Sequence, residues 1–76
     1  MKLTNIDLRE LERADYGRGQ ERLINGARWA VVRTGPGGEI DHVLSTHRTE
    51  SAAINSLRRW AAGAGANQLH YGKISL

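Results

Sequence analysis

Apolar residues near the N-terminus recur at helical spacing. The positions on this face lie three to five residues apart and are Leu3, Leu8, Leu11 and Ala14. Thr4 is a suitable N-cap, and Asp7 stands where an acid interacts favourably with the positive end of a helix. The pattern predicts a short amphipathic helix of about ten residues. Gly17 and Gly19 are expected to end it, and its alternating charges are typical of a solvated face.

The central part of the chain has the pattern of strands joined by turns. Asn25-Gly26 separates residues 20–24 from residues 27–34 and favours a hairpin, because both residues tolerate a positive φ. Residues 28–34 are rich in strand-forming side chains. The Gly35-Pro36-Gly37-Gly38 run predicts a second turn, with residues 39–47 as the antiparallel partner of residues 28–34.

A second helix and a last strand complete the predicted domain. Thr49 is the expected N-cap, Glu50 lies in the first turn, and Gly63 and Gly65 end the helix. The apolar arc consists of Ala53, Ile54, Leu57, Trp60, Ala61 and Ala64, and Ser51, Asn55, Arg58, Arg59 and Ala62 face away from it. Residues 69–76 form the last strand. The predicted fold class is α+β, with a short N-terminal helix and one helix packed on an antiparallel sheet of three or four strands.

Composition limits the class of protein. The 76 residues fit a single domain, 1–76, near the lower size limit for unaided folding, and no cysteine is present. No signal peptide and no membrane-spanning run is recognised, so a cytoplasmic location is expected. The net charge of +3 lies wholly in residues 42–76, where Arg48, Arg58, Arg59 and Lys73 face Glu50 alone. This excess is smaller than the dense basic stripe of most nucleic-acid binders.

The sequence predicts neither a metal site nor a catalytic site, and no cofactor. His42 and His47 are an odd number of residues apart, so on a regular strand they point to opposite faces, which leaves His42 and His70 as the pair that could meet. Ser45, Thr46 and His47 are neighbours on a strand, and neighbours rarely converge as a nucleophile and its base. The 35–38 turn lacks the lysine and hydroxyl of a phosphate-binding loop. Little room is expected for a small-molecule pocket.

Two surfaces are candidates for binding a partner. One is the polar helix face with Arg58, Arg59, Asn55 and Ser51, which suits phosphate or an acidic protein patch; the alternative is that this face is only the solvated back of the helix. The other lies on the sheet and consists of Trp29, Arg33, Arg28 and Tyr71. If Ala30 and Val32 face the helix, Trp29 lies outward as an interface anchor or a stacking platform. In the alternative, Trp29 and Val31 are core residues.

Residues 28–74 resemble a small bacterial family of unknown function with a strand-strand-helix-strand pattern. The resemblance rests on the Trp29-Ala30-Val31-Val32-Arg33 strand, on Ser45-Thr46-His47, on the Thr49-Glu50-x-Ala52-Ala53 helix start and on His70-Tyr71-Gly72. It supports the predicted fold and implies no activity.

In length, lack of cysteine and sheet-and-helix layout, the whole chain also resembles the small phage-encoded inhibitors of bacterial defence, including anti-CRISPR proteins. This resemblance implies an inhibitor that occupies a protein or nucleic-acid site of a host nucleoprotein complex such as a CRISPR effector. The leading hypothesis is therefore a non-catalytic binding protein of that type. The alternatives are a nucleic-acid-binding module that uses the same arginines and a structural homodimer joined at a sheet edge.

Overall fold

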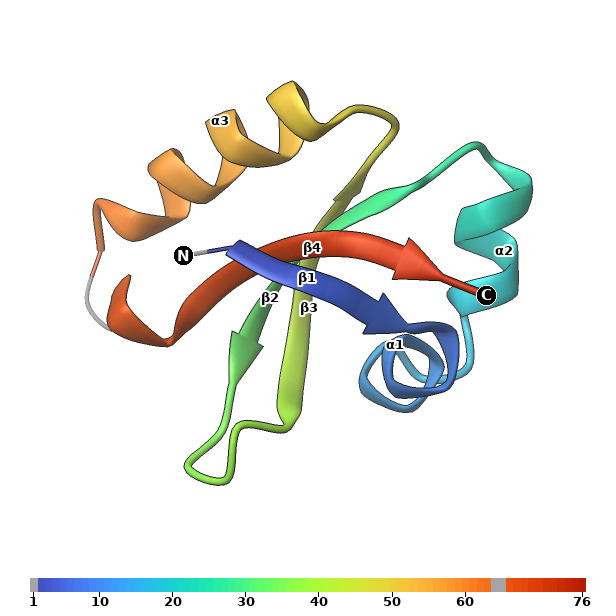
Figure 1. Cartoon of the computed structure of the whole chain (residues 1–76), viewed down its shortest axis with the longest axis horizontal. Coiled ribbons are helices and arrows are strands. Elements are labelled where there is room, and N and C mark those ends of the chain that lie inside the picture. Colours follow the sequence, from blue (N-terminus) through green and yellow to red (C-terminus); the bar gives the residue numbers. More distant parts are fainter. Residues whose placement is uncertain (1, 64–65) are drawn as a thin grey trace.

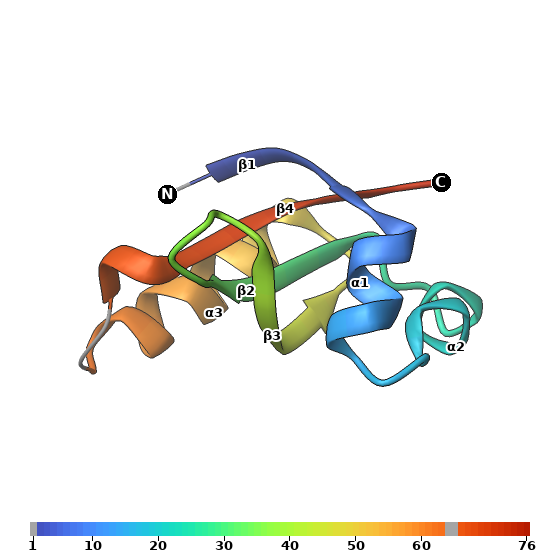
Figure 2. The same ribbon diagram turned by 90° about the horizontal axis from the view of Figure 1, so that it is seen from below.

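The computed structural model describes residues 2–63 and 66–76 as a four-stranded sheet with helices on both faces (Figures 1 and 2). The strands are β1 (Lys2–Asp7), β2 (Trp29–Thr34), β3 (Ile40–His47) and β4 (Leu69–Ser75). The helices are α1 (Leu8–Ala14), α2 (Gly19–Ile24) and α3 (Glu50–Ala61), with a 3₁₀ turn at Ala66–Gln68. The α+β class predicted from the sequence is confirmed.

The sheet is mixed, whereas the sequence predicted an antiparallel one. The strand order is β1-β4-β2-β3; β2 runs antiparallel to both of its neighbours, but β1 runs parallel to β4. The predicted helix start at Thr4 is wrong, because residues 2–7 form this additional strand. The helix begins after Asp7, whose carboxylate accepts a hydrogen bond from the Arg9 amide at 2.8 Å. Helical spacing did not reveal β1, because its pairing partner lies at the other end of the chain.

The hairpin predicted around Asn25-Gly26 is also wrong, because residues 19–24 are helical. Asn25 is the C-cap of α2, and Gly26 follows with a φ of 96°. The Gly26 amide donates to the Leu23 carbonyl and the Ala27 amide to the Arg22 carbonyl, as in a Schellman motif. Asn-Gly is thus used here for the left-handed turn that ends a helix, a conformation that also occurs in tight hairpins.

Gly26 offers a test of this helix end. Gly26→Ala is expected to lower the free energy of unfolding by about 1–2 kcal/mol, because a side chain disfavours the left-handed conformation. A Cβ there would also lie 3.0 Å from Arg48 Nε, whereas a Cβ on Gly17, at a φ of 82°, meets nothing within 4 Å. Gly17→Ala is therefore the matched control, and urea denaturation should find Gly26→Ala the more destabilised. Equal losses would mean that the Arg48 contact adds nothing.

The second predicted hairpin is confirmed, and two bulges alter its side-chain pattern. β2 and β3 pair from Trp29↔His47 to Thr34↔Ile40, with register shifts after Val31 and after Arg33. The first shift places one extra β3 residue in the ladder and reverses the alternation of faces. Because His47 opposes Trp29 and His42 opposes Arg33, both histidines lie on one face of the sheet.

His70 instead opposes Val32, on the other face. The expectation that His42 and His70 could meet is therefore wrong. The prediction for the faces of His42 and His47 failed because parity counting assumes an unbulged strand.

Both faces of the sheet are buried, each under its own helix. Ala30, Val31 and Val32 of the central strand β2 are all fully buried. One cluster contains Ala30 and Val32 with residues of β1, α1 and β4: Ile6, Leu11 and Ile74. The other contains Val31 with Ala53 of α3 and Tyr71 of β4, and Trp29 packs against it. Val31 is therefore a core residue, as in the second alternative, while Trp29 is half-buried beside that core, and Ala30 and Val32 form a second core.

The helix α3 starts as predicted. Thr49 caps it by accepting a hydrogen bond from the Ala52 amide at 3.2 Å, and Ala53 and Ser56 are buried against the sheet. The helix ends at Ala61, before Gly63; Ala64 and Gly65 lie outside the described residues. Trp60 was expected on the buried arc, but its side chain is 47% exposed. The apolar arc extends past Ser56, the last buried residue of α3, and the Trp60 side chain borders a cavity.

Candidate binding site

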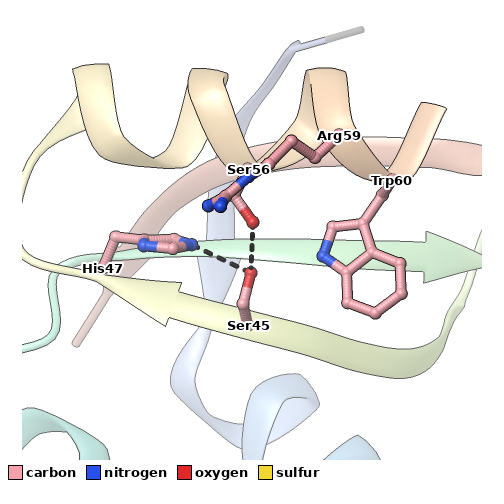
Figure 3. Close-up of a pocket in the computed structure, with 5 residues that line it drawn as sticks. All are labelled: Ser45, His47, Ser56, Arg59 and Trp60. Atoms are coloured by element: carbon pink, nitrogen blue, oxygen red, sulfur yellow. Dashed lines mark hydrogen bonds between the residues drawn. The ribbon is translucent and has the colours of Figure 1, made fainter. Parts of the chain in front are cut away.

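A cavity of about 480 Å³ lies between the edge strand β3 and α3 (Figure 3). Two of its lining residues, Ser45 and His47, are alternate residues of β3 and therefore share a face. The others are on α3: Arg59 and Trp60 follow Ser56 by three and four residues and project from the same side of the helix. Little room for a pocket was expected, yet this volume lies within the usual range for ligand sites, about 300–1,000 Å³.

Ser45 connects strand and helix at the floor of this cavity. Its Oγ lies 2.9 Å from His47 Nε2 and 2.9 Å from the Oγ of Ser56, which is 3% exposed. A hydroxyl can donate one hydrogen bond and accept others, so both contacts can form together. Figure 3 shows Ser45 between the His47 and Trp60 rings, with the Arg59 side chain extending along α3 toward His47. The buried hydroxyl of Ser56 is thereby satisfied, and the His47 ring is held in place.

Partial burial and one nearby charge favour the neutral form of the His47 ring. Partial burial lowers the pKa of His47 from its ordinary value of 6.5, and the nearby Arg59 charge lowers it further. Within the described residues, Ser45 is the hydrogen-bond partner of the ring. A nucleophilic serine needs a base that a third group orients, typically a carboxylate. Ser45 and His47 do converge, contrary to the expectation from the sequence. A separate hydrogen bond joins Ser45 to Ser56.

A second cavity of about 360 Å³ also has His47 in its wall. The other residues come from α2, the end of β3 and the start of α3: Arg22, Asn25, Ala27, Thr46, Arg48, Thr49 and Ala52. We call the two cavities together the His47 groove. Among the described residues, its lining includes the basic side chains Arg22, Arg48 and Arg59 and no aspartate or glutamate. The groove is therefore electrostatically suited to an anionic ligand.

The arginines of the chain differ in whether the fold already satisfies them. Arg22 pairs with Asp15 at 3.0 Å, and Arg33 pairs with Asp41 at 3.0 Å. Arg28 donates to the carbonyls of Leu23 and Ala27. Arg58 and Arg59 are exposed and form no ion pair with any other described residue. Their charges are available to a partner.

The two surfaces predicted from the sequence fare differently. Asn55, Arg58 and Arg59 all lie exposed on α3. On the sheet, Trp29 is half-buried and its ring lies 6.1 Å from that of Tyr71, which is 9% exposed. These two aromatic rings pack beneath α3 and offer no free stacking platform there. The helix residues thus share one exposed element, whereas the sheet residues Arg28 and Arg33 are held by backbone carbonyls and by Asp41.

Sequence reasoning missed most of the groove. Ser45 and His47 were considered only as members of a consecutive run, although their spacing of two residues was the informative signal. Trp60 was assigned to the core, and Ser56 was not singled out. Arg48 counted only toward the basic excess of residues 42–76, and nothing in the sequence placed it beside α2.

No protein-family model, curated protein or solved structure matches this chain. Among the described residues, no group of three or more histidine, cysteine or acidic side chains could hold a metal ion. Within the same residues, no helix combines the length and apolar character needed to cross a membrane.

Proposed function

We propose that this chain is a non-catalytic binding protein that recognises an acidic surface of a protein partner through the His47 groove and the adjoining arginines of α3. The observation that carries the proposal is the charge distribution: the described lining of the groove has no acid, and Arg58 and Arg59 lack intramolecular carboxylate partners among the described residues, whereas Arg22 is already paired with Asp15. Tryptophan and arginine, both present here, are the residues that most often dominate the energy of protein interfaces.

The chemistry of the Ser45 cluster supports binding over catalysis. Ser45 Oγ bridges His47 and the buried Ser56, so attack on a substrate would disrupt the contact that satisfies Ser56. By occupying a functional site on its partner, the protein would act as an inhibitor of a host nucleoprotein complex. This extends the resemblance to phage-encoded inhibitors, with the basic groove as the contact surface.

The experiment is a pull-down with the tagged protein from nuclease-treated bacterial lysate, with bound proteins identified by mass spectrometry. Wild type is expected to retain a stoichiometric protein partner, and Arg58→Ala/Arg59→Ala should weaken this binding at least tenfold. The matched control is Arg9→Ala/Arg13→Ala, which removes two exposed charges from α1 and should bind like wild type. If only nucleic acid co-purifies, and binding to a DNA duplex falls steeply with salt, the protein is a nucleic-acid-binding module and the proposal is wrong.

A further inference from the structure

The strand that forms one wall of the groove is an edge strand. In the order β1-β4-β2-β3, β3 has a neighbour on one side only, and that neighbour is β2. The backbone amides and carbonyls on the other side of β3 form no strand pairing within the described chain. Such an edge can pair with an extended segment of another chain.

The part of β3 that pairs with β2 in regular register is also the part that lines the groove. Ser45, Thr46 and His47 pair in regular register with Val31, Ala30 and Trp29, and the bulge interrupts the ladder directly before them. The same three residues supply the β3 wall of the two cavities. A bulge discourages long continuous pairing, including pairing between two copies of the same edge. The part of β3 that follows the bulge, Ser45–His47, is the segment on which a partner strand would pair.

The side chains above this segment determine what would fit. An added strand has alternate side chains on the α3 side of the sheet, where the 480 Å³ cavity lies. There they would meet Arg59 and His47, with the half-exposed Trp60 ring beside them. Carboxylates at alternate positions would form charge-assisted hydrogen bonds with the guanidinium.

We propose that the partner adds a short, extended acidic segment as a strand along the free edge of β3, placing alternate carboxylates in the His47 groove. This inference rests on the proposed function and specifies its partner. A peptide suits the site better than a nucleic acid strand, because a strand edge is matched by another peptide backbone. Binding of single strands typically uses successive stacking rings, and the part of the groove lining that the structure describes has one large aromatic ring, that of Trp60.

The test is a selection from a library of random 12-residue peptides displayed on phage, with the immobilised full chain as bait. Enriched peptides are expected to carry aspartate or glutamate at alternate positions. Synthesised singly, they should bind wild type at least tenfold more tightly than Arg59→Glu. Arg13→Glu, which makes the same charge change on the exposed surface of α1, should leave their binding unchanged.

Two further measurements test strand addition itself. N-methylation of alternate peptide amides should weaken binding at least tenfold for one set of amides and little for the other, because only alternate amides face the β3 edge. Amide chemical-shift changes in the labelled protein should centre on Ser45–His47. Selected peptides without alternating acids, equal tolerance of both N-methylated sets, or shift changes centred on β1 would each overturn the inference.

The outcomes also separate this inference from the proposed function. If the nuclease-resistant partner still depends on Arg58 and Arg59 while the peptide selection fails, strand addition is wrong and the proposed function stands. If a (dT)12 oligonucleotide binds with dependence on Arg59 and no protein partner is retained, both are wrong.

Discussion

Leu11→Ala should lower the free energy of unfolding by about 2–5 kcal/mol, the range for a buried leucine truncated to alanine. Leu11 is fully buried, and it is the one fully buried residue of α1. It fixes this short helix against the cluster formed by Ile6, Ala30, Val32 and Ile74. Removing its side chain leaves a cavity where α1 meets the sheet.

The effect is large relative to the total stability expected for a chain of 76 residues, on the order of 5 kcal/mol. Urea denaturation followed by tryptophan fluorescence would measure it, and the melting temperature should fall by roughly 10 °C or more. The control is Ile24→Ala, which truncates an 83% exposed side chain on α2 and should change stability by less than about 0.5 kcal/mol. A loss at Leu11 no larger than that of the control would show that α1 does not pack on the sheet as described.

The parts of the fold that the sequence predicted are those specified by local chemistry. The 35–38 turn follows a strand of branched and aromatic side chains, and both features act within a few residues. The cap at Thr49 and the apolar spacing of α3 are equally local. The last strand was also predicted correctly, at Leu69–Ser75.

The parts that the sequence did not predict depend on contacts between distant residues. β1 is stabilised by pairing with β4, where Lys2 opposes Tyr71 and Asp7 opposes Ser75. No pattern within residues 2–7 distinguishes that strand from the first turns of the helix that follows. At Asn25-Gly26 the positive φ was anticipated for Gly26, whereas Asn25 has a φ of −80°; the choice between helix end and hairpin depends on whether residues 19–24 pack as a helix.

The candidate site shows the same division. Exposure of Arg58 and Arg59 follows from helical periodicity and was predicted. Ser45 and Ser56 meet because α3 packs against one face of β3. His42 and His47 lie on the same face because the bulge adds one residue between them. Neither has a signal in the sequence. The groove therefore depends on the strand register, which contacts between distant residues determine.

The second large effect is expected at Tyr71. Tyr71→Ala should lower the free energy of unfolding by about 3–5 kcal/mol, as for other buried aromatic residues truncated to alanine. The Tyr71 ring packs with Trp29, Val31 and Ala53 beneath α3. This cluster lies on the face of the sheet opposite the one that Leu11 covers. The Tyr71→Ala substitution should therefore leave the packing of α1 on the sheet unchanged.

Tyr71→Phe separates the ring from its hydroxyl. The hydroxyl donates to Glu50 Oε2 at 3.3 Å, a long contact, so its loss should cost only about 1 kcal/mol. Denaturant unfolding of both variants would measure the difference. A loss for Tyr71→Phe as large as that for Tyr71→Ala would mean that the hydroxyl and not ring packing secures α3. A small loss for both would mean that Tyr71 is free for the partner-binding role predicted from the sequence. The expected large difference would instead assign the ring to the core, because a side chain that is 9% exposed has little surface left to offer a partner.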